Sequence, residues 1–110
     1  MSETTLVIER TVSITADNPL FVGHFPGFPV YPGVSQIQDV CDTLSEHFGQ
    51  TVNLENISRT KFLSFVTPPA TLRVVCHVDN NNISWDITRD GNNVCVGRGI
   101  ARFTRELPSQ

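Results

Sequence analysis

Much of the chain alternates between apolar and polar residues with the two-residue period of half-buried β-strands. Residues 5–15 are rich in β-branched types, and the alternation returns in the second half of the chain. Turn-forming residues at 67–70, 80–82 and 89–92 separate these stretches. The pattern therefore predicts strands over residues 5–15, 53–65, 72–79, 83–88 and 94–103, of which the second is long or broken.

One stretch has a helical period instead. Its apolar residues recur three and four positions apart, as on one face of a helix: Val34, Ile37, Val40, Cys41, Leu44 and Phe48. Gly33 lies at the start of this helix, and Gly49 fits its C-terminal cap. We expect Gln36 and Asp39 to be solvated or to lie in an interface. One apolar helix beside a long antiparallel sheet indicates an α+β fold in which the sheet wraps the helix.

Composition limits the class of protein. The chain has 110 residues, of which 39% are apolar and 17% are charged, and these values are typical of a single globular domain over residues 1–110. A domain of this size buries a modest core, so a shared dimer interface would add stability. The net charge of −3 disfavours nucleic acid as the main partner, because phosphate binding needs a basic surface.

The three cysteines, Cys41, Cys76 and Cys95, are odd in number and form no CxxC motif. This spacing predicts neither a secreted disulfide framework nor a zinc site. The N-terminal residues lack the apolar run of a signal peptide, and no stretch has the length of a membrane-spanning helix. We therefore expect a reduced, soluble, cytoplasmic protein.

The segment FVGHFPGFPVYPG, residues 21–33, holds three prolines, three glycines and four aromatic rings. Proline fixes φ and extends the residue before it, so this composition predicts a stiff, packed loop. His24 would be held in one place there, and imidazole suits proton transfer near neutral pH. The N–H of Gly33 would be unpaired at the helix start, where it can polarise a carbonyl oxygen. Such a pair of groups suits proton abstraction next to a thioester carbonyl.

These residues resemble a known family. GHFPGFPVYPGV is similar to the signature GHFPGxPxxPGV of the FabZ/FabA family of 3-hydroxyacyl-ACP dehydratases. The stretch NPLFVGHF resembles the family's approach to this motif, and residues 59–62 and 67–72 loosely resemble its KFxxPVxPGD segment. The short length also resembles a sub-group found beside aryl-polyene and polyketide clusters.

The resemblance implies a dimeric hot-dog fold and a substrate carried on the phosphopantetheine arm of an acyl carrier protein. It implies that His24 removes the α-proton while the Gly33 N–H holds the thioester oxygen. The carbonyl of Val30 would orient the His24 ring. The product is a trans-2-enoyl thioester, and neither a metal nor a diffusible cofactor is needed.

One position departs from the family pattern. The family has a catalytic Glu or Asp fourteen positions after the histidine, where this chain has Gln38. An amide can hydrogen-bond a hydroxyl but cannot protonate it. Asp39 is turned about 100 degrees away around the helix. Asp42 lies one turn beyond Gln38 and could reach the site through a water.

Gln38 therefore leaves several functions open. The chain either dehydrates a 3-hydroxyacyl thioester with Gln38 as a positioning group, or it is a weak or inactive subunit beside a related dehydratase that supplies the acid. Acyl thioester hydrolysis is a third possibility. Phe62 and Phe65 either line an acyl tunnel or pack in the core.

Most of the positive charge is on six residues: Arg59, Lys61, Arg73, Arg98, Arg102 and Arg105. Some of them could form a patch for an acidic carrier protein. Solvated strand edges explain them equally well, because Lys and Arg also protect edges from pairing. His77, on the polar face of its strand, is assigned no role.

Overall fold

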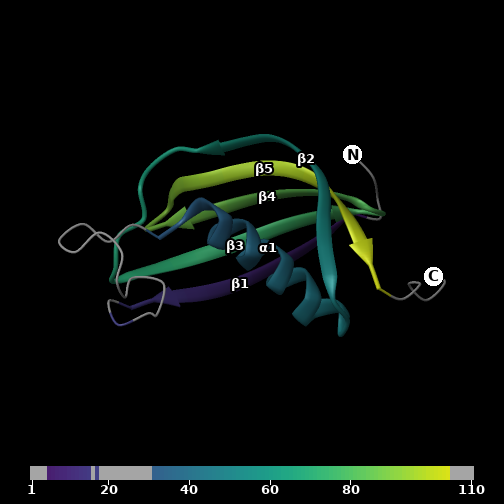
Figure 1. The fold of residues 1–110 in the computed structure, drawn as a ribbon, viewed down its shortest axis with the longest axis horizontal. Helices are drawn as coiled ribbons and strands as arrows, with labels where there is room; N and C mark the ends of the chain where they lie inside the picture. Colours follow the sequence, from purple (N-terminus) through teal and green to yellow (C-terminus); the bar gives the residue numbers. More distant parts are fainter. Residues whose placement is uncertain (1–4, 16, 18–30, 105–110) are drawn as a thin grey trace.

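A computed structural model describes residues 5–15, 17 and 31–104 (Figure 1). The elements are β1 (Leu6–Ile14), α1 (Gly33–Phe48), β2 (Val52–Phe62), β3 (Ala70–Asp79), β4 (Asn82–Arg89) and β5 (Asn92–Phe103). The strands form one antiparallel sheet in the order β1-β3-β4-β5-β2, curved around the single helix. The predicted α+β arrangement is confirmed, and dimer formation stays a prediction.

The core lies between α1 and the concave face of the sheet. Val40 and Leu44 of α1 are fully buried, as are Leu72 of β3 and Ile87 of β4. Along β3 and β4 every second side chain is buried, as the alternating pattern predicted. Val74 pairs with Ile87 across the two strands, so both project onto the face that the helix covers.

The turns form where the sequence places residues that tolerate positive φ. Gly49 ends α1 at φ 66°, with its N–H bonded to the carbonyl of Ser45 at 2.9 Å. Asp90 and Gly91, at φ 53° and 81°, form the two-residue turn of the β4–β5 hairpin. The predicted helix boundaries and hairpin are therefore confirmed.

The strand predicted over residues 53–65 ends earlier, at Phe62, and is irregular. Its pairing with β5 shifts register twice, between Glu55 and Ser58 and between Ser58 and Lys61. Asn56 and Arg59 have positive φ values of 52° and 53° within these shifts. Such bulges bend and twist a strand, which is why β2 curls at the edge of the sheet.

Two expectations about α1 are wrong. Val34, assigned to the buried face, is 78% exposed, whereas Gln36 and Asp39 are 3% and 7% exposed. The helix contacts β1 and β2 as well as β3, so the buried surface extends beyond its apolar stripe onto polar positions. Val34 lies in the first turn and projects away from these strands.

Within the described ranges, no helix is long and apolar enough to cross a membrane. No group of three His, Cys, Asp or Glu side chains among the described residues is placed to hold a metal ion. Cys41, Cys76 and Cys95 are free and buried, as expected for Cys41 from its apolar helix face.

The buried thiols give a direct test of the core. Burial raises the pKa of Cys76 to about 12 and also raises the pKa values of Cys41 and Cys95. Because the thiolate is the reactive form, Cys76 should react with Ellman's reagent roughly a thousandfold more slowly in the folded protein than in urea. In urea, three thiols of the wild type and two thiols of Cys76→Ala should react with the reagent. Rapid native labelling of Cys76 would contradict this packing.

Candidate functional site

Gly33 begins α1 as predicted, and its main-chain N–H is available. Pro32 is the N-cap residue, with φ −64° and ψ 147°, and no side chain caps this end. The N–H groups of Ser35 and Gln36 donate to the carbonyl of Pro32 at 3.1 and 3.2 Å. Within the described part of the chain, the Gly33 N–H has no acceptor, as is usual for the first residues of a helix. The positive end of the helix dipole adds to its capacity to stabilise a developing negative charge.

Phe62 packs directly on Gly33. A Cβ at position 33 would lie 2.8 Å from Cζ of Phe62 and 2.9 Å from its Cε1, closer than such atoms approach. Gly33 is therefore needed for this close approach rather than for an unusual backbone conformation. The structure brings together two of the predicted site residues, one from α1 and one from the end of β2.

The segment after β2 exposes apolar side chains beside the start of α1. Phe62 and Leu63 are each 53% exposed and Phe65 is 74% exposed. The next residue, Val66, accepts the Tyr31 N–H at 2.7 Å, which fixes the segment next to the chain entering α1. The expectation that Phe62 and Phe65 pack in the core is therefore wrong. Their contact with an acyl chain stays a prediction.

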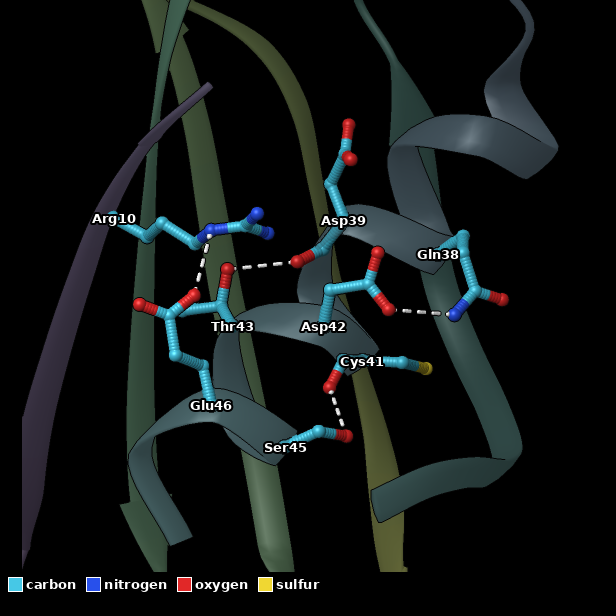
Figure 2. A network of polar contacts seen from close by, with 8 residues as sticks. All are labelled: Arg10, Gln38, Asp39, Cys41, Asp42, Thr43, Ser45 and Glu46. Atoms are coloured by element: carbon cyan, nitrogen blue, oxygen red, sulfur yellow. Dashed lines mark hydrogen bonds and ion pairs between the residues drawn. The ribbon is translucent and has the colours of Figure 1, made fainter. Parts of the chain in front are cut away.

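Gln38 is exposed on α1, five residues after Gly33 or about 7.5 Å along the helix axis. Its Nε2 donates to Oδ1 of Asp42 at 2.9 Å (Figure 2). Asp42 therefore lies on the same face as Gln38, as predicted, and bonds to it directly, whereas its reach into the site through a water stays a prediction. Because the amide nitrogen faces Asp42, Oε1 of Gln38 remains to accept a hydrogen bond from a hydroxyl or a water.

The other two predicted site residues, His24 and Val30, lie outside the described residues, so their roles stay predictions. Tyr31 is the first described residue after them and is tied down at three points. Its N–H bonds to Val66, its carbonyl accepts from Nε2 of Gln36 at 3.4 Å, and its hydroxyl donates to Asp39. The chain therefore enters α1 from a fixed position.

The contact between Tyr31 and Asp39 was not anticipated from sequence. The Tyr31 hydroxyl donates to Oδ2 of Asp39 at 2.7 Å, and both side chains are buried. Burial raises the pKa of the Asp39 carboxyl, while the hydrogen bond from Tyr31 and the charge of Arg10 partly oppose the increase. The periodicity of the helix could not reveal this contact, because its partner Tyr31 precedes the helix.

Arg10 joins β1 to the same side of α1. Its Nε lies 3.2 Å from Oε2 of Glu46, and its guanidinium extends toward Asp39 (Figure 2). The Gln38–Asp42 pair is on the other side of the helix in this view. The helix thus carries the buried Tyr31–Asp39 contact, the more exposed ion pair to Arg10 of β1, and the exposed Gln38–Asp42 pair, which can meet another molecule.

The raised pKa of Asp39 predicts a pH-dependent stability. The folded protein keeps the Asp39 proton to a higher pH than the unfolded chain, whose carboxyl titrates near roughly 4. The resulting stabilisation is complete below that value and is lost as the pH rises through the folded value. Relative to Asp39→Asn, the wild type should lose free energy of unfolding between acid and neutral pH, as measured by urea titration. A difference in free energy of unfolding between the two proteins that does not change with pH would contradict this prediction. The matched control is Asp42→Asn, which removes an exposed carboxyl of the same helix.

The contact between Gly33 and Phe62 predicts non-additive stabilities. Alanine favours helix over glycine by about 1 kcal/mol, but at position 33 its methyl must displace the Phe62 ring. Gly33→Ala should therefore gain little or lose stability in the wild type and should stabilise the Phe62→Leu background. We expect a coupling of about 0.5–2 kcal/mol from a double-mutant cycle of urea unfolding. Additive free energies would show that the ring does not constrain position 33.

Comparison with known sequences identifies the family to which the chain is similar. The sequence model of the ApeI-like family, described as ApeI dehydratase, matches residues 1–98. The chain is 33% identical over 98 residues to the 3-hydroxyacyl-acyl-carrier-protein dehydratase FabZ of Chloroflexus aggregans, covering 83% of this chain and 60% of that protein. It is 36% identical over 87 residues to FabZ of Anaplasma phagocytophilum, covering 67% and 60%. The chain thus spans about three fifths of the length of these curated relatives.

Solved structures share the fold. An uncharacterized protein from Erwinia carotovora subsp. atroseptica superposes with a TM-score of 0.81 at 23% identity, covering 96% of this chain and 90% of that one. The dehydratase heterocomplex ApeI:P from Xenorhabdus doucetiae gives a TM-score of 0.69 at 23% identity, with coverages of 86% and 87%. These neighbours confirm the hot-dog fold. Because the family match covers residues 1–98 of 110, the chain belongs to the ApeI-like dehydratase family, as its FabZ/FabA-like motif indicated.

Proposed function

We propose that this chain takes part in the dehydration of a 3-hydroxyacyl thioester to a trans-2-enoyl thioester, with the acyl group held on an acyl carrier protein. The observation that carries the proposal is the N–H of Gly33 at the start of α1, which has no acceptor among the described residues and lies beside the exposed ring of Phe62. The N–H supplies an oxyanion donor, and the ring supplies an apolar surface for the acyl chain. The setting is fatty-acid or polyketide-type synthesis, including that of aryl polyenes, in the cytoplasm.

The roles follow from the chemistry of each group. His24 takes the α-proton as the base, and the thioester oxygen accepts a hydrogen bond from the Gly33 N–H as negative charge develops there. Val30 orients the His24 ring through its carbonyl. The hydroxyl then leaves from the β-carbon and requires a proton. The reaction needs no metal or diffusible cofactor.

Gln38 is suited to binding the hydroxyl rather than to protonating it. One N–H of its amide nitrogen is donated to Asp42, which leaves the second N–H and the acceptor oxygen Oε1 for a hydroxyl. An acceptor holds a hydroxyl in place by its hydrogen but does not help it to leave. The proton must therefore come from another group, either Asp42 through a water or a carboxylic acid on a second subunit.

This requirement favours a partner-dependent reaction. A homodimer would present Gln38 in both sites, whereas a heterodimer with a related acid-bearing dehydratase would complete one of them. The fold neighbour from Xenorhabdus doucetiae is described as a dehydratase heterocomplex, which supports this arrangement by analogy. In the extreme case the chain contributes structure and acyl binding, and its partner contributes the acid.

The acid at position 38 can be restored by mutation. Wild type alone should turn over a 3-hydroxyacyl carrier-protein substrate slowly, and Gln38→Glu should raise kcat by about 10²- to 10⁴-fold, the usual range for a general acid. Water loss is followed by the mass of the acyl carrier protein. Gln38→Ala is the matched control, because it removes the amide without adding an acid.

His24→Ala decides whether the measured turnover uses the proposed site. It should abolish activity in both the wild-type and the Gln38→Glu proteins. Activity that survives His24→Ala would defeat the assigned base. A fast wild-type reaction that Gln38→Glu does not accelerate would show that the chain needs no acid at this position and would remove the argument for a partner.

A further inference from the structure

The face of the sheet that points away from α1 carries the polar positions of β3, β4 and β5. Two adjoining hollows on this face share His77, Ser84 and Arg98, and the larger has a volume of 760 Å³. Arg59 and Lys61 of β2 also line the larger hollow. We call these five residues the basic groove.

Among the described residues, the three cations of the basic groove have no acidic partner, in contrast to Arg10, Arg73 and Arg102. Among the described residues, ion pairs join Arg10 to Glu46, Arg73 to Glu9 and Arg102 to Glu55. No such pair is found, within the same part of the chain, for the other four cations of the strands: Arg59, Lys61, Arg98 and Arg89, of which Arg89 donates to the carbonyl of Pro69 instead. Three of the four strand cations without an acidic partner therefore line one groove.

Carboxylates are scarce in the groove. Asp86 is the one carboxylate among the residues that line the larger hollow, and it lies 3.7 Å from Nε2 of His77. The smaller hollow adds one further carboxylate, Asp79, so the two hollows together hold three cations and two carboxylates in a chain whose net charge is −3. An acidic partner would be repelled by most of this protein and attracted here, so the electrostatic field selects this face.

The groove is also close to the candidate site. Lys61 and Phe62 are consecutive in β2, so their side chains project to opposite faces of the sheet. Lys61 lines the groove, whereas Phe62 packs on Gly33. The end of β2 therefore connects the basic face to the position where the thioester oxygen would bind.

We propose that the basic groove is the docking surface for the acidic face of the acyl carrier protein that delivers the thioester. This inference rests on the proposed function, because a tethered substrate requires its carrier to contact the protein near the reacting group. Arg59, Lys61 and Arg98 bind carboxylates of the carrier, and the acyl arm passes the end of β2 to reach Gly33.

A binding measurement tests the docking surface without requiring turnover. The probe is a fluorescently labelled acyl carrier protein of fatty-acid synthesis that carries its phosphopantetheine arm but no acyl group. Lys61→Ala combined with Arg98→Ala should weaken its binding at least about tenfold at low salt, and added salt should reduce the difference. The control is Arg102→Ala combined with Arg73→Ala, which makes the same change in net charge but removes cations that are already paired with Glu55 and Glu9.

Equal weakening by the two double variants would overturn the proposal, since it would show a response to net charge alone. Absence of carrier binding by the wild type, or tighter binding of a single-stranded oligonucleotide than of the carrier, would also overturn it. Circular dichroism should show that both variants fold.

Turnover separates this proposal from the proposed function. The same 3-hydroxyacyl group is supplied on the carrier protein and on free pantetheine, and the two kcat/KM values are expressed as a ratio. The groove variant should lower that ratio about tenfold, and the control should leave it within about twofold. Groove-dependent carrier binding without turnover of either substrate would defeat the dehydratase function alone. Turnover whose ratio does not depend on the groove would defeat the docking surface alone.

Discussion

The burial of one helix against the concave face of the sheet is the contact on which the described fold depends. Val40 and Leu44 meet the inward side chains of β3 and β4, and each such side chain contributes about 1.5–3 kcal/mol when it is removed from water. Because α1 is the one helix among the described residues, the inward positions of the strands converge on it. This constraint curves the sheet and fixes which strand residues face outward.

Because the sheet curves, the helix is enclosed on its flanks as well as along its apolar stripe. Beside α1, the buried Tyr31 hydroxyl donates to the buried Asp39 side chain, and Arg10 of β1 forms a more exposed ion pair with Glu46. A buried carboxylate without such partners would be costly. The Tyr31–Asp39 contact therefore fixes where the chain enters α1, and that entry sets the position of the first helical N–H groups.

The irregular edge strand β2 determines what the candidate site can present. Its register shifts twist the strand, and its last residue, Phe62, reaches over Gly33. Since successive residues of a strand face opposite sides, Lys61 lines the outer basic groove. One short segment thus contributes an apolar ring to the inner side and a cation to the outer side.

The sequence alone determined the element order, the helix that starts at Gly33 and is capped by Gly49, and the tight turns, because periodicity and glycine placement are local properties. Its motif also indicated the dehydratase family, which the family match confirmed. Only the tertiary structure decided that Asp39 is buried and that β2 ends at Phe62. These features depend on which elements meet across the fold, and contacts between residues distant in sequence leave no periodic trace along the chain.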